Sequence, residues 1–177
     1  MPLHLQEAAQ SPVPLCIAEH AACGDHAVGL NENKEVTMEN VKLGTKAVGS
    51  IVKIKVNGAS KDFIVVQQGN PNTSTYDSSC AGTWLLMKDI YTTSTFGNNN
   101  SYKDSSIHTY LNGTFYNLID SNIRAAIKQV KIPYQNGTGS GGSLATGSNG
   151  LSTKVFLLSG YEVGWTTSDN GNFPRTV

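Results

Sequence analysis

Residues 106–134, with the sequence SIHTYLNGTFYNLIDSNIRAAIKQVKIPY, hold two short amphipathic helical patterns and an exit into an apolar strand. Ser105 or Ser106 can cap the first helix, because a serine hydroxyl accepts from free amides of a first turn. Asp120 or Ser121 can cap the second helix in the same way. The apolar residues of both patterns fall on one side of each helix. This stretch therefore predicts core packing against a sheet, and its residue types are not those of a catalytic site.

The sheet is predicted from the stretches that come before these helices. Residues 50–56, SIVKIKV, alternate apolar and polar side chains, and residues 61–66, KDFIVV, return as a second strand. Asn57-Gly58 lies between them and accepts positive φ angles, so a β-hairpin is expected, with a loop of two residues or more. Residues 83–90, TWLLMKDI, are a short apolar run typical of a buried strand.

Five further segments complete the expected layout. Residues 15–23 have a weak helical pattern, and Asn112-Gly113 is expected to interrupt the first helix of the 106–134 stretch. Residues 135–150, rich in Gly and Ser, predict a long loop. Residues 154–158, KVFLL, predict a core strand, and residues 159–163 a turn capped by Ser159.

The length suggests one domain with a short appendage, and the patterns above predict that this domain is α+β, a small antiparallel sheet with two short helices. The chain has 177 residues, 38% hydrophobic and 15% charged, with a formal net charge of zero. We expect residues 1–39 to be a disordered tail or linker and residues 40–177 to be the domain, incomplete at its C-terminus. Because the chain is neutral, we do not expect it to bind nucleic acid. Because it has no apolar run of about 20 residues, we do not expect it to insert into a membrane.

Cysteine and histidine gather in one short segment. Cys16, His20, Cys23 and His26 fall within eleven residues, and a helix would bring the first three to one face. Zinc sites usually separate their ligands into two spaced pairs, so this spacing is crowded, and a tail without metal is the preferred interpretation. Together with Cys80 the chain has three cysteines, which is no disulfide framework.

No arrangement of acid, base and nucleophile is recognisable. Cys80 and His108 are the residue types of a nucleophile and base, without the local sequence of a cysteine protease. Ser159 is not in a G-x-S-x-G elbow, and the Gly-rich loop lacks the G-K-[S/T] ending of a phosphate loop. We therefore expect no catalytic residue, no metal and no cofactor.

Candidate binding residues lie near the C-terminus. Trp165 adjoins the polar stretch TTSDNGN and could stack on a sugar, and Asp169 and Asn170 could offer oxygen ligands, without the spacing of an EF-hand. The chain also has N-x-[S/T] sequons at Asn72, Asn99, Asn112 and Asn136. These sequons are interpreted as Asn-rich turns.

Four stretches carry a resemblance that covers residues 40–177. They are VKLGTKAVGSIVKIKVNGASKDFIVVQQGNP, CAGTWLLMKDIY, SSIHTYLNGTFYNLIDSNIRAAIKQVKIPY and KVFLLSGYEVGWTTSDN. In their order and spacing they resemble an uncharacterised domain family of phage tail or minor structural proteins and of surface proteins of Gram-positive gut bacteria. Fuller members continue past the last stretch into a segment similar to C-type-lectin-like folds, so the resemblance implies a partial lectin-like domain.

The resemblance implies a role in adhesion. The expected function is a non-enzymatic phage tail-associated structural or receptor-binding component; the alternative is a bacterial cell-surface module that binds carbohydrate or protein. The implied partners are a host cell-surface glycan or protein, other tail proteins and a second copy of the chain. The implied location is the virion, or the bacterial cytoplasm before lysis for a prophage product, with the bacterial surface as the alternative.

Overall fold

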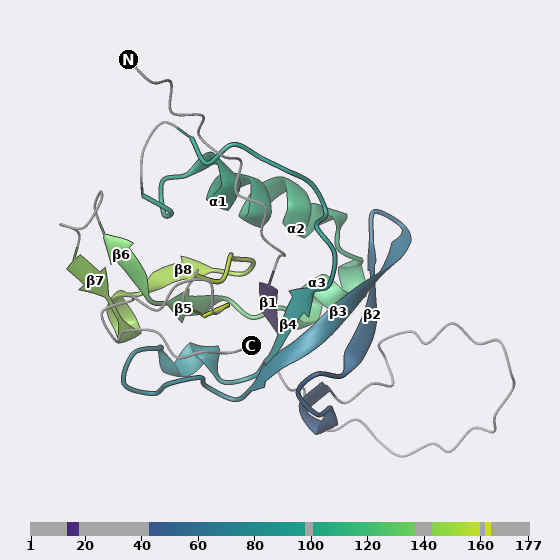
Figure 1. The fold of residues 1–177 in the computed structure, drawn as a ribbon, viewed down its shortest axis with the longest axis horizontal. Helices are drawn as coiled ribbons and strands as arrows, with labels where there is room; N and C mark the ends of the chain where they lie inside the picture. The colour runs from purple at the N-terminus through teal and green to yellow at the C-terminus, as the bar shows by residue number, and fades with distance from the viewer. Residues whose placement is uncertain (1–13, 18–42, 98–100, 137–142, 160–161, 164–177) are drawn as a thin grey trace, which may run out of the picture.

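The computed structural model describes residues 14–17, 43–97, 101–136, 143–159 and 162–163 (Figure 1). The architecture is α+β, as predicted. Its main sheet is antiparallel, with the strand order β1-β4-β3-β2. The strands are β1 (Pro14–Ile17), β2 (Ile51–Val56), β3 (Ala59–Gln68) and β4 (Thr83–Met87).

The β2–β3 hairpin forms as its sequence predicts. Val56 pairs with Ala59, so the loop consists of Asn57 and Gly58 alone. Asn57 has φ 51° and Gly58 has φ 74°. Positive φ at both loop residues is the geometry that follows the right-handed twist of paired strands, and asparagine and glycine adopt it most easily.

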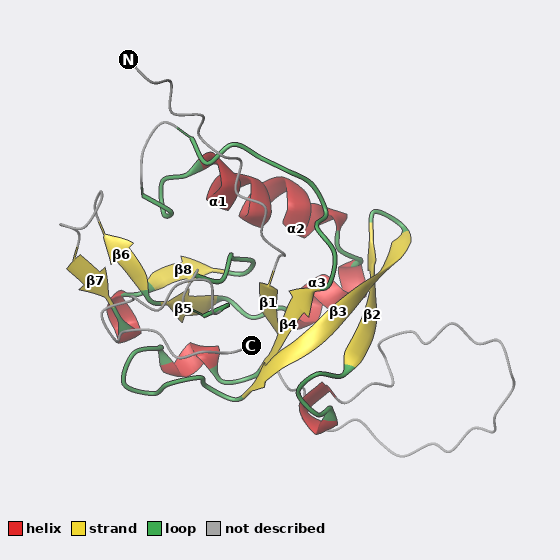
Figure 2. Ribbon diagram, viewed as in Figure 1, coloured by secondary structure: helices red, strands yellow, loops and turns green. Residues whose placement is uncertain are grey.

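A helical layer covers one face of this sheet (Figure 2). It consists of α1 (Ser106–Tyr110), the π-helical turn η4 (Leu111–Phe115), α2 (Tyr116–Leu118) and α3 (Ser121–Ala126). Ser105 accepts from the amide of His108 and Asp120 from that of Asn122, so both expected caps are confirmed. The expected interruption at Asn112-Gly113 is wrong, because the chain continues through it as the π-helical turn.

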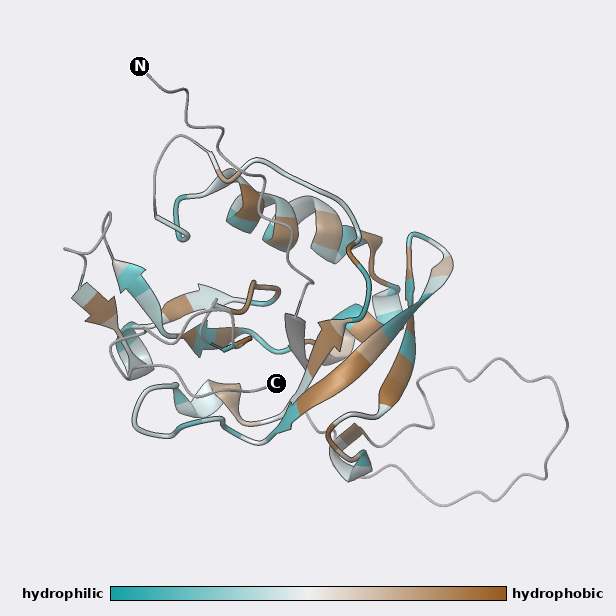
Figure 3. Ribbon diagram, viewed as in Figure 1, coloured by the Kyte–Doolittle hydropathy of each residue, from teal (hydrophilic) through white to brown (hydrophobic). Residues whose placement is uncertain are grey.

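Strand β4 is buried on both faces, which explains its uninterrupted apolar sequence. Leu85 and Met87 pack into the cluster under the helices, whereas Trp84 and Leu86 pack into a second cluster on the opposite face. Successive side chains of a strand point to opposite faces, so each cluster receives alternate residues of β4. Figure 3 shows the resulting concentration of hydrophobic residues along β3 and β4.

Two small antiparallel sheets complete the described part of the fold. Strand β5 (Val130–Ile132) pairs with β8 (Leu151–Thr153), and β6 (Tyr134–Asn136) pairs with β7 (Ser143–Ala145). The strand expected at 154–158 is therefore misplaced: pairing with β5 ends at Thr153, and beyond it only Val155 forms an isolated β-bridge, although Val155, Phe156 and Leu158 are buried. Part of the loop expected at 135–150 is strand.

The N-terminal region contributes β1 to the edge of the main sheet. Pro14 to Ile17 pair with Leu86 to Thr83 of β4. The helical pattern expected over 15–23 is therefore wrong for residues 15–17, whose pairing with β4 outweighs a weak local preference. Residues 1–13 and 18–42 lie outside the described part. In the portion of the chain that is described, no helix has the length and hydropathy to cross a bilayer.

Candidate functional site

The second hydrophobic cluster is organised around Trp84. Its indole N–H donates to the carbonyl of Cys80 at 2.9 Å, so the polar atom of this fully buried ring has a partner. Tyr76 and Phe156 meet the indole at edge-to-face angles, with ring centroids 5.5 Å and 5.2 Å away. Three interlocked rings of this kind hold Tyr76 and Phe156 in fixed orientations.

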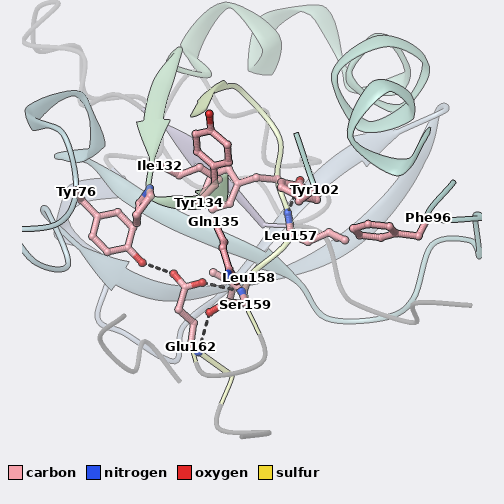
Figure 4. Close-up of a pocket in the computed structure, with 12 residues that line it drawn as sticks. Tyr76, Phe96, Tyr102, Ile132, Tyr134, Gln135, Leu157, Leu158, Ser159 and Glu162 are labelled. Carbon is pink, nitrogen blue, oxygen red and sulfur yellow. Dashed lines mark hydrogen bonds between the residues drawn. The ribbon is translucent and has the colours of Figure 1, made fainter. Parts of the chain in front are cut away.

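A pocket of about 300 Å³ opens against this cluster (Figure 4). Most of its wall is aromatic or aliphatic, and one carboxyl group, that of Glu162, contributes to it. The lining residues are Tyr76, Phe96, Tyr102, Ile132, Pro133, Tyr134, Gln135, Phe156, Leu157, Leu158, Ser159 and Glu162. A concave apolar wall with few polar groups is the usual composition of a ligand site.

Glu162 is fixed by reciprocal hydrogen bonds with Ser159. The amide of Ser159 donates to Oε2 of Glu162 at 2.6 Å, and the amide of Glu162 donates to Oγ of Ser159 at 3.2 Å. This exchange is a capping box, in which a serine and an acid three residues later satisfy each other's backbone amides. The hydroxyl of Tyr76 donates to Oε1 of Glu162, and the carboxyl group is therefore held from two directions (Figure 4).

Burial changes the acidity of the groups around the pocket. Glu162 is only 5% exposed, and desolvation raises the pKa of its carboxyl above the ordinary value, although its hydrogen bonds favour the ionised form. Desolvation and the neighbouring carboxyl raise the pKa of Tyr76, and desolvation raises that of Tyr102. Both phenols therefore remain protonated in any physiological range.

Asn112 connects the helical layer to the pocket wall. Its Nδ2 donates to the carbonyl of Val155 at 2.8 Å, and its Oδ1 accepts from the amides of Lys154 and Val155 at 2.9 Å and 3.2 Å. The segment held in this way continues directly into Phe156, which lines the pocket. Asn112, in the π-helical turn, thus helps to position Phe156, a residue of the pocket wall that lies 44 positions later in the sequence.

Comparison with known proteins identifies the family. Residues 81–174, just over half of the chain, match the model of the family described as "Domain of unknown function (DUF6273)". The chain belongs to the DUF6273 family. No curated protein matches it, and no solved structure matches it.

The pocket lies almost wholly within the DUF6273 region. Of its lining residues only Tyr76 precedes the matched residues 81–174. The helical layer, β4 and the small sheet β5–β8 also fall inside them. The hairpin β2–β3 and strand β1 lie outside the match although they pair into the same sheet as β4.

The residues considered for chemistry are in structural roles. Cys80 is buried, its thiol donates to the carbonyl of Lys131 at 3.3 Å, and desolvation raises its pKa to about 11. His108 instead lies edge-on to Tyr102, with a centroid distance of 5.1 Å. A protonated, buried thiol is a poor nucleophile, so this DUF6273 chain does not present Cys80 as an activated cysteine.

Other candidates fall outside what is described. Trp165, Asp169 and Asn170 lie beyond the last described residue, and His20, Cys23 and His26 lie in the gap after β1. The backbone at Cys16 is strand, so the shared helical face assumed for a metal site does not exist at that residue. Within the described residues, no three His, Cys, Asp or Glu side chains are placed to hold a metal ion.

The expectation that Ser159 caps a turn is confirmed. The pocket itself was missed, and so were Tyr76, Tyr134 and Glu162 as its residues. One local signal existed: Ser159 and Glu162 have the S-x-x-E spacing of a capping box, and the acid follows an apolar run. Nothing local indicates that Tyr76 lies beside an acid 86 residues away.

Proposed function

We propose that this DUF6273 chain is a non-enzymatic binding module and that the aromatic pocket holds a group of its partner. The observation that carries the proposal is the composition of the pocket, which combines a wall of aromatic and aliphatic side chains with one rigidly held carboxyl group. This wall can bury a ligand, and its polar group can orient it.

The state of the titratable groups favours binding over catalysis. Glu162 accepts one hydrogen bond on each carboxyl oxygen, from Tyr76 and from the Ser159 amide, which fixes its position, and the pKa values of Tyr76 and Tyr102 are raised. A general base near neutral pH needs a free, poised group within reach of a substrate proton. Tyr76 and Tyr102 stay protonated in that range, and Glu162 is an acceptor fixed in position beside them, which suits a binding group.

The proposed setting is a phage tail, in which the chain serves as a structural or receptor-binding component that contacts a host glycan or surface protein. The resemblance of residues 40–177 to tail-associated proteins supports this setting. A surface module of a Gram-positive bacterium is the second candidate, supported by the same resemblance. Mass spectrometry of particles released on induction separates the two, since only the first predicts the chain in the virion.

A binding screen tests the function itself. The full chain is presented to a glycan array and to whole Gram-positive cells, alongside Tyr134→Ala and Phe96→Ala, which remove parts of the pocket wall. Tyr110→Ala is the matched control, because it also truncates a half-buried aromatic but lies outside the pocket. We expect wild type and the control to bind and both wall variants to lose binding. Absence of binding by wild type, or equal binding by all four proteins, overturns the proposal.

A further inference from the structure

The buried carboxyl of Glu162 has no cation beside it in the described part of the chain. Its oxygens accept from the Tyr76 hydroxyl and the Ser159 amide, both neutral donors. The one ion pair between described side chains joins Lys53 to Asp62. A buried carboxylate normally has a cationic partner, because neutral hydrogen bonds offset only part of its lost hydration.

The carboxyl group also keeps room for a further partner. An ionised carboxylate has about four acceptor positions on its two oxygens. The neutral donors occupy one on each oxygen, and Figure 4 shows the group among the side chains that line the pocket. A cation that enters the pocket would meet an acceptor already fixed in position.

The remaining wall suits a cation that carries alkyl groups. Phe96, Tyr102, Tyr134 and Phe156 supply aromatic rings, and Leu158 supplies aliphatic surface. Aromatic rings attract cations through their negative faces, and they also bury methyl or methylene groups. A carboxyl and rings around a small space therefore match both halves of an organic ammonium ion.

Other ligand classes fit less well. An anion would face the Glu162 carboxyl, and a neutral sugar ring needs several hydrogen-bonding side chains around it. The lining offers chiefly rings and aliphatic groups, and a volume of about 300 Å³ is at the lower limit for ligand pockets. The space accommodates a head group or side chain better than an oligosaccharide.

We propose that this pocket binds an organic ammonium group, with Glu162 as its counter-ion and the surrounding rings as its walls. The proposal deepens and rests on the binding role proposed above.

The first experiment compares two ligands of the same shape on the wild-type chain. Choline carries the charge, and 3,3-dimethylbutan-1-ol is its neutral isostere. Titration calorimetry and chemical-shift mapping are expected to show choline binding at least about tenfold more tightly, with shifts at Tyr134 and Glu162. Equal affinity, or no binding of choline, overturns the ammonium proposal.

The pH profile gives a second readout. Glu162, Tyr76, Tyr102 and Tyr134 are the titratable side chains lining the pocket, and Cys80 adjoins Tyr76. The pKa values of Tyr76 and Tyr102 are raised, and that of Cys80 lies at about 11, so a change in affinity at acidic to neutral pH is assigned to Glu162. Choline affinity should rise with pH as the carboxyl ionises. A flat profile contradicts the counter-ion role.

Glu162→Gln isolates the charge. The amide oxygen can still accept from Ser159, and its nitrogen can donate to the Tyr76 hydroxyl, so the wall keeps its hydrogen bonds. We expect about tenfold or greater loss of choline affinity with the isostere unaffected. If the chain binds choline but no cell or glycan, the proposed adhesion role is refuted and the ammonium site stands. If it binds cells but not choline, the ammonium site is refuted and the adhesion role stands.

Discussion

Replacing Asn112 by alanine should destabilise the fold more than any other single asparagine substitution in the helical layer. The side chain donates to the carbonyls of His108 and Val155 and accepts from the Thr153 hydroxyl and the Lys154 and Val155 amides. These bonds join the helical layer to the segment that becomes the pocket wall. Alanine removes the partner of the Lys154 and Val155 amides, whereas the His108 carbonyl still accepts from the Leu111 amide.

The magnitude follows from which groups water can reach. Val155 is fully buried, so its amide becomes an unsatisfied donor at a cost of about 1–3 kcal/mol. The Val155 carbonyl can accept the single proton of the Thr153 hydroxyl once Asn112 is gone, and the half-buried Lys154 amide can reach water, so these losses are smaller. We expect about 3 kcal/mol in total, which lowers the melting temperature of a chain of this size by about 6–12 °C.

Thermal and urea unfolding followed by circular dichroism measures this effect. Asn117→Ala is the matched control, because Asn117 is exposed and its Oδ1 accepts from the Arg124 guanidinium at the surface. The control should stay within about 0.5 kcal/mol of wild type. If Asn112→Ala also stays within that range, Asn112 does not anchor the 153–155 segment and the reasoning fails.

Three further predictions concern backbone contact, titration and surface charge. Gly150→Ala should cost about 1–3 kcal/mol in urea unfolding, because its Cβ would lie 2.7 Å from the Ile132 carbonyl oxygen. Gly113→Ala meets nothing within 4 Å and should instead stabilise the helical layer by up to about 1 kcal/mol. Because the folded-state pKa of Glu162 is raised, its contribution to stability is fully present below the unfolded-state pKa and is lost as pH rises through the folded one. Wild type should therefore lose stability relative to Glu162→Gln as the pH rises above the ordinary glutamate pKa, and a difference that does not change with pH would contradict the desolvation. Lys53→Ala breaks an exposed cross-strand ion pair and should leave the melting temperature unchanged within error; a clear drop would show that the pair matters.

Elements with a local cause could be predicted from the sequence. The Asn57-Gly58 turn needs only two residues that accept positive φ, and the Ser105 and Asp120 caps act within their own first turns. Strand β4 was recognisable because burial on both faces leaves it without a charged residue and makes its last four residues apolar.

Elements that depend on residues distant in the sequence could not be predicted. Asn112-Gly113 has the composition of a helix break, and its partners at 153–155 hold it in the helical layer instead. Strand β1 exists because β4 offers it an edge. The pocket depends on the hydrogen bond between Tyr76 and Glu162, and no short-range sequence pattern predicts that contact.

The place of β4 in the sheet has a consequence for where a folding unit can be cut. The family match begins at residue 81, two residues before β4, whereas both strands that pair with β4 lie before it. A fragment reduced to residues 81–174 would expose two unpaired edges of the uncharged segment TWLLM, which is the composition of an aggregating strand. We expect that fragment to be insoluble on expression and a fragment that starts before β1 to be soluble. The reverse result would show that β4 needs neither neighbour. The region that matches the family is therefore shorter than the unit that we expect to fold. Strand β4 lies inside the matched region, and its partners β1 and β3 lie before it.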